Sequence, residues 1–116
     1  MILNMKLSHE NIINLEDHRT PGAKVFTGRD LGKKAREKSE INRIENQFES
    51  VTIIIPDNVY SIIPSFFEEL FLDVVLKLGK ENFLEKFKFV SEGSYKYKKP
   101  LNEAIERILR DNTAIG

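Results

Sequence analysis

The chain has no cysteine, no tryptophan and only two histidines in its 116 residues. The absence of cysteine excludes disulfide bonds, thiolate metal sites and a cysteine nucleophile. Two histidines also argue against a metal centre. No apolar run approaches the roughly 20 residues of a membrane-spanning helix, and the N-terminus does not have the layout of a signal peptide. We therefore expect a cytoplasmic protein that contacts no membrane and needs no cofactor.

An excess of either charge is missing as well, because 18 Lys and Arg balance 18 Asp and Glu, with an isoelectric point of about 6.7. This balance argues against bulk electrostatic binding to nucleic acid. The charges are nevertheless unevenly distributed. Residues 24–43 carry seven bases and three acids, residues 45–73 carry six acids and no base, and residues 74–100 carry seven lysines and three glutamates. We expect a surface with distinct charged sectors.

The composition, 41% hydrophobic and 31% charged, is typical of one folded domain, which we place over residues 1–116. Residues 1–23 are expected to form an N-terminal hairpin or strands, in which residues 1–7 pair with residues 11–15. The elements expected over residues 24–110 are a strand at 24–26, a helix at 28–39, a buried strand at 51–55, an extended piece at 59–63, helices at 64–78 and 82–87, a strand at 87–90 and a helix at 100–111. This alternation predicts the α/β class, with a small mixed sheet covered mainly by helices.

Local signals support the central elements. The β-branched run Val51–Ile55 is typical of a buried strand. Pro64 suits the first turn of the helix that follows, since its missing N–H costs nothing there, and Gly79 ends or bends that helix. Thr27 is the expected N-cap of the earlier helix, with Asp30 at the capping-box position.

No cluster of residues predicts catalysis. The stretch Gly28–Lys34 resembles a phosphate-binding loop, but it has three residues between its glycines where the Walker spacing needs four, and Lys34 replaces the hydroxyl residue. No group of Asp, Glu or His is arranged for acid–base chemistry, so we expect a protein that is not an enzyme. The stretch Tyr95–Lys99 interleaves aromatic and cationic residues, as single-strand binders do, but it also fits an edge strand protected by lysines. The neutral total charge favours the second interpretation.

Ser65 stands where the loop enters the most strongly patterned helix. A phosphate at this position would meet free backbone N–H groups and the positive end of the helix dipole. The simpler interpretation is that Ser65 belongs to the capping turn, and the physical argument alone favours that interpretation.

Several stretches together suggest a family. The strand Val51–Ile55, the helix start Ile62–Phe71 (IIPSFFEELF), the strand-to-helix entry Phe26–Gly32 (FTGRDLG) and the step Leu84–Val90 resemble STAS-like domains. The resemblance covers about residues 24–110 and is strongest to an uncharacterised bacterial branch related to anti-sigma factor antagonist domains. It implies a STAS-like α/β sandwich that acts as a non-enzymatic regulatory module and binds a GHKL-type ATPase kinase or another regulator. Many such domains are phosphorylated on a serine at the start of the core helix, the position that Ser65 occupies.

These observations predict a protein-interaction module, switched by charge at Ser65 or by competition between partners. The predicted partner-binding residues lie between the buried strand and the start of the core helix: Asp57, Asn58, Tyr60, Ser61, Ser65, Glu68 and Glu69. An alternative is a small immunity protein or antitoxin that neutralises a basic toxin through the acidic block 45–73. A third is an enzyme whose site is scattered along the chain, which would show as a deep polar pocket.

Overall fold

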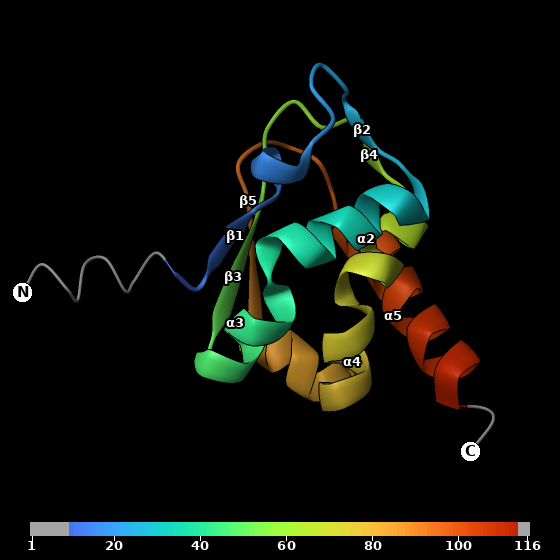
Figure 1. Cartoon of the computed structure of the whole chain (residues 1–116). Coiled ribbons are helices and arrows are strands. Elements are labelled where there is room, and N and C mark those ends of the chain that lie inside the picture. The colour runs from blue at the N-terminus through green and yellow to red at the C-terminus, as the bar shows by residue number, and fades with distance from the viewer. Residues whose placement is uncertain (1–9, 114–116) are drawn as a thin grey trace, which may run out of the picture.

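A small parallel sheet, with one face buried and the other only partly covered, forms one side of the structure, a computed structural model that describes residues 10–113. Its three strands are β1 (Ile12–Asn14), β3 (Val51–Ile55) and β5 (Phe87–Ser91), in the order β1-β3-β5 (Figure 1). The predicted strand β3 lies in the middle, and its alternate residues Val51, Ile53 and Ile55 are fully buried. Residues 1–7, the expected first strand of the hairpin, lie outside the described residues, and β1 pairs in parallel with β3.

A second pair of short parallel strands leads into the two helices that surround the candidate site. Strand β2 (Val25–Phe26) pairs with β4 (Ser61–Ile62). Helix α2 (Gly28–Ser39) follows β2, and helix α4 (Pro64–Lys86) follows β4. Because the two strands run in parallel and in register, the N-terminal turns of α2 and α4 begin at the same end of the pair.

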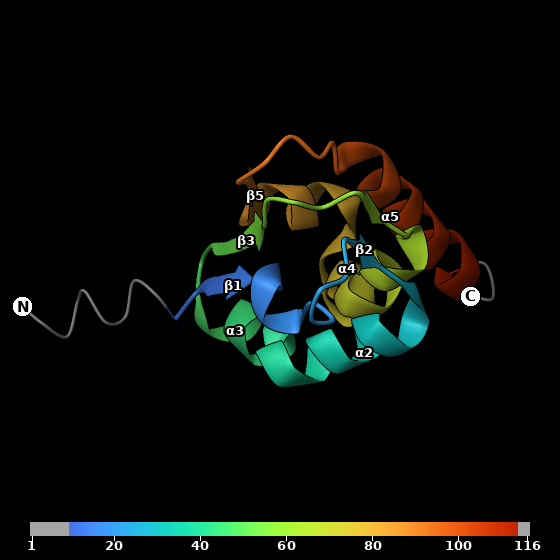
Figure 2. The ribbon, with the colours of Figure 1, turned by 90° about the horizontal axis from the view of Figure 1, so that it is seen from above.

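Helix α4 contributes more buried core residues than any other described element and lies between α2 and α5 (Lys98–Thr113) (Figure 2). As predicted, Pro64 occupies its first turn, and Gly79, with φ 80° and ψ 166°, interrupts it. The buried rings of α4 continue into β5, since Phe83 stacks on Phe87 with 4.6 Å between ring centroids. This packing holds the C-terminal end of α4 against the sheet.

Two local features differ from the expectation. Residues Ile41–Gln47 form a helix, α3, that the pattern did not predict, and Glu40 separates it from α2 in a left-handed conformation at φ 56°. Thr27 is the N-cap of α2, but its side chain makes no capping hydrogen bond, so the predicted capping bond is wrong. A 3-10 turn, η1 (Leu15–His18), follows β1. The predicted α/β class is confirmed.

None of the helices described between residues 10 and 113 combines the length and the apolar character needed to cross a membrane.

Candidate functional site

The connector between β3 and β4 holds the first of the predicted site residues, and its backbone is fixed by distant groups. Arg19 donates from Nη2 to the carbonyl oxygens of Asp57, at 2.9 Å, and of Asn58, at 3.2 Å. Asn58 adopts a left-handed conformation, with φ 56°. The N–H of Tyr60 then donates to the carbonyl of Lys24 at 2.7 Å. These bonds hold the connector at both of its ends.

Tyr60 projects from this fixed connector with 80% of its surface exposed, the largest exposed fraction among the described large apolar side chains. Asp57 is exposed and Ser61 is half-buried. Ile63, which follows β4 as the N-cap residue of α4, is 39% exposed. The connector therefore displays an aromatic ring and a carboxylate on a backbone that has few alternative conformations.

Ser65 lies half-buried in the first turn of α4. No side chain caps the start of α4 at Ile63, just as Thr27 makes no capping bond at the start of α2. Both helices begin at the same end of the β2–β4 pair, so their positive dipole ends lie close to Ser65. A negative charge on this hydroxyl would be electrostatically favourable here.

Glu68 and Glu69 are part of an ion-pair network that joins three helices. Glu68 is only 6% exposed and contacts Arg29 at 3.3 Å and Arg107 at 3.0 Å. Glu69 contacts Arg29 at 3.3 Å and Arg36 at 3.6 Å, and Arg36 also donates to the Glu69 carbonyl at 2.7 Å. Arg29 therefore bridges two neighbouring carboxylates that a helical repeat places on different sides of α4. The network holds α2 and α5 against the start of α4.

The acidic block 45–73 does not form one acidic face in the described structure. Like Glu68 and Glu69, Glu45 makes internal ion pairs, with Lys77 and Lys86, each at 2.8 Å. Burial of the Glu45 carboxylate opposes its ionisation, but the two lysines donate hydrogen bonds and supply positive charge. Their combined effect is larger and holds the pKa of Glu45 below its usual value. The acids of the block that make no ion pair with a described residue are exposed on separate segments: Glu49 before β3, Asp57 after β3 and Asp73 on α4.

The structure thus places Asp57, Asn58 and Tyr60 on one fixed connector, Ser61 at the start of β4 and Ser65 in the first turn of α4. Sequence reasoning missed Arg19, which anchors the connector from 38 residues away. Nothing in the polar stretch around Arg19 indicates such a distant contact. Among residues 10–113, no group of three or more His, Asp or Glu side chains could hold a metal ion. Comparisons of the chain with protein-family models, with curated proteins and with solved structures find no match.

Proposed function

We propose that the chain is a non-enzymatic regulatory module that binds a partner protein through the connector surface. We define this surface as Asp57, Asn58, Tyr60, Ser61 and Ser65, with Glu69 at its margin. The observation that carries the proposal is the 80% exposure of Tyr60 on a connector anchored by long-range hydrogen bonds. Large aromatic side chains are enriched among the residues that dominate binding energy at protein interfaces.

Rigidity supports this assignment. Tyrosine offers a large contact area for the loss of only two side-chain torsions, so it binds at a low cost in conformational entropy. The bonds from Arg19 and to Lys24 fix the connector before any partner arrives. A surface that is ordered in advance spends less of its interaction energy on ordering during association. Within the proposal, Glu68 has a positioning role, because it holds the start of α4 and is not free for a partner.

The class of partner follows from the resemblance to STAS-like domains, which implies a GHKL-type ATPase kinase or another regulator. In this proposal, phosphorylation of Ser65 adds about −1.5 to −2 charges beside the starts of α2 and α4. Such a charge at the edge of the connector surface would change the affinity for a partner that contacts Tyr60. Variants of Ser65 therefore test whether binding is switched by charge.

The alternative function, neutralisation of a basic toxin, depended on a continuous acidic face. Glu45, Glu68 and Glu69 are occupied by lysines and arginines of the same chain. The observed charges therefore give this alternative less support than the sequence did.

Site-specific photo-crosslinking in the native cells tests the proposal. A photoreactive amino acid replaces Tyr60 in one variant and Leu76 in the control. Leu76 is also large, apolar and 41% exposed, but it lies outside the connector surface. We expect a crosslinked partner from position 60 that is absent from position 76, and mass spectrometry identifies its class.

Two further variants then test the switch in the position 60 background. We expect Ser65→Asp to change the crosslinking yield, whereas Ser65→Ala retains the yield of the unphosphorylated protein. The proposal is wrong if position 60 yields no specific product. A specific product with equal yields from both serine variants would retain the binding surface and remove the switch.

A further inference from the structure

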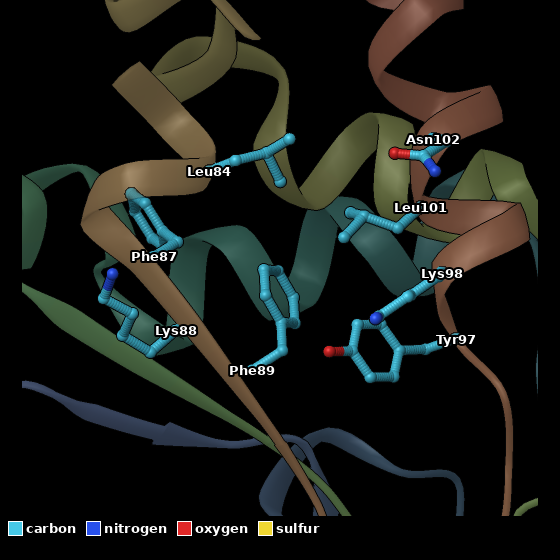
Figure 3. Close-up of a pocket in the computed structure, with 8 residues that line it drawn as sticks. All are labelled: Leu84, Phe87, Lys88, Phe89, Tyr97, Lys98, Leu101 and Asn102. Carbon is cyan, nitrogen blue, oxygen red and sulfur yellow. The ribbon is translucent and has the colours of Figure 1, made fainter. Parts of the chain in front are cut away.

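A second surface, separate from the connector, is an apolar groove beside β5. It lies between the end of α4 and the start of α5, has a volume of about 450 Å³ and is open to solvent. Leu84 from α4, Phe89 from β5, Tyr97 and Leu101 supply much of its apolar lining (Figure 3). Leu84 is 37% exposed. We call this the β5 groove.

The floor of the β5 groove is held in a fixed shape. The rings of Phe89 and Tyr97 stack with 5.3 Å between centroids and 20° between planes. Phe87, which also lines the groove, is 1% exposed and stacks on Phe83. Tyr95, two residues before Tyr97, accepts a hydrogen bond from the N–H of Ile62 at 3.0 Å. This bond anchors the segment that carries Tyr97, so the groove exists before any ligand binds.

Lysines line part of the groove or lie next to its lining residues in the chain. Lys88 and Lys98 line it, and Lys96 and Lys99 flank Tyr97 and Lys98 in the chain. All four are exposed and make no ion pair with any residue described between positions 10 and 113. Two glutamates neighbour lining residues in the chain, Glu85 and Glu103, and Glu103 contacts Arg107 at 3.7 Å. The rim therefore has a net positive charge that nothing described in the chain neutralises.

We propose that the β5 groove binds an acidic segment of a partner protein, which inserts one large apolar side chain between Leu84, Leu101 and Tyr97. The carboxylates on either side of that side chain would pair with the free lysines of the rim. Apolar contact supplies the affinity, and complementary charge supplies the orientation and the rate of association.

The geometry favours a peptide over the other ligands that lysines attract. A flat anionic membrane does not reach the floor of a concave groove. Single-stranded nucleic acid needs free ring faces for stacking, whereas Phe89 and Tyr97 stack on each other and Leu84 and Leu101 offer no ring. A second copy of the chain would bring two lysine rims together, which like-charge repulsion opposes.

The chain contains no tryptophan, and this makes a direct binding assay available. The probe is a synthetic peptide with a single central Trp flanked by Asp and Glu. Its fluorescence, excited where tyrosine absorbs little, shifts to shorter wavelength when the indole enters the groove. One control peptide carries Lys in place of the acids. A second carries Ser in place of Trp, and because it has no fluorescence signal, its binding is measured by competition with the Trp peptide. We expect micromolar binding of the acidic Trp peptide only, and weaker binding as the salt concentration rises.

Matched protein variants assign the signal to the groove. Lys88→Glu with Lys98→Glu reverses two rim charges at exposed positions, so the fold should survive, and we expect affinity to fall about tenfold. Lys33→Glu with Lys34→Glu reverses two exposed lysines on α2 and should leave affinity unchanged. Leu84→Asp should also abolish binding, whereas Leu76→Asp should not.

Each contrary outcome overturns the proposal. Equal loss in the α2 control variant would mean that the peptide responds to overall charge. A response to single-stranded DNA or to phosphatidylserine vesicles, without a response to the acidic Trp peptide, would assign the lysines to nucleic acid or membrane. Self-association that the Lys88 and Lys98 reversal removes would assign the groove to a second copy of the chain.

Discussion

Replacement of Glu45 by glutamine removes one buried charge and leaves the size of the side chain almost unchanged. The Glu45 side chain is 4% exposed, and its two carboxylate oxygens each contact a lysine at 2.8 Å. The Lys77 side chain is 53% exposed, so solvent screens its ion pair with Glu45, and we assign this pair a contribution of about 0.5 kcal/mol to stability. Lys86 is 20% exposed, and its charged hydrogen bond contributes about 2 kcal/mol. Glu45→Gln should therefore lower the free energy of unfolding at pH 7 by about 2–3 kcal/mol.

The pH dependence of this effect follows from the direction of the pKa shift. The lysines hold the pKa of Glu45 in the folded protein below its value of 4.5 in the unfolded chain. Stabilisation from this group is therefore complete above pH 4.5 and is lost as the pH falls through the folded-state pKa. The wild-type protein should lose more stability than Glu45→Gln between pH 5 and pH 3, so the difference between them should shrink toward low pH.

Urea unfolding followed by far-UV circular dichroism at pH 7, 5 and 3 measures this difference. The matched control is Glu49→Gln, because Glu49 is exposed and makes no ion pair with a described residue. We expect the control to stay within about 0.5 kcal/mol of the wild type at every pH. A Glu45→Gln effect below that level at pH 7, or one that is equal at all three pH values, would refute the assigned role of the ion pairs.

Three further changes test the packing. Gly32→Ala places a Cβ 2.5 Å from the carbonyl oxygen of Phe66, so it should lower the free energy of unfolding by about 2–3 kcal/mol, whereas Lys33→Ala on the exposed side of α2 should not. Burial is the main cause that lowers the pKa of His18, so the unfolded chain binds more protons than the folded one and stability should fall as the pH drops below 6.5. His18→Gln should flatten this dependence, and an NMR titration of the imidazole, assigned by comparison with that variant, should show the lowered pKa. Tyr95→Phe removes the hydroxyl that accepts a hydrogen bond from a β4 backbone N–H, and thermal unfolding should show a loss of about 1–2 kcal/mol.

The elements that could be predicted from the sequence are those whose formation depends on neighbouring residues in the chain. Val51–Ile55 is β-branched throughout, Pro64 fits only the first turn of a helix, and Gly79 readily adopts the positive φ that interrupts α4. Helix α3 escaped prediction because Glu40, a residue that rarely adopts a left-handed conformation, separates it from α2. No glycine or proline marks that boundary in the sequence.

The candidate site likewise has features that local sequence predicts and features that depend on tertiary contacts. The positions of Asp57 and Tyr60 on a connector, and of Ser65 in a first helical turn, follow from the neighbouring strand and helix. The burial of Glu68 does not, because it depends on α5 covering that side of α4 through Arg107. The anchoring of the connector by Arg19 likewise depends on the tertiary fold. Contacts between residues nearly 40 positions apart leave no periodic signal in a single sequence.

The uneven charge distribution, the first unusual feature of the sequence, acquires a different meaning from these contacts. Acids in the middle of the chain pair with arginines and lysines from the blocks on either side, at Glu45, Glu68 and Glu69, so much of the acidic block serves to hold helices together. The exposed lysines around β5 have no such partners in the described residues. The charge left free for recognition is therefore largely positive beside β5, whereas the connector surface presents an aromatic ring and one exposed carboxylate. A chain whose net charge is zero thus presents two surfaces of different chemistry, which favour ligands of different charge.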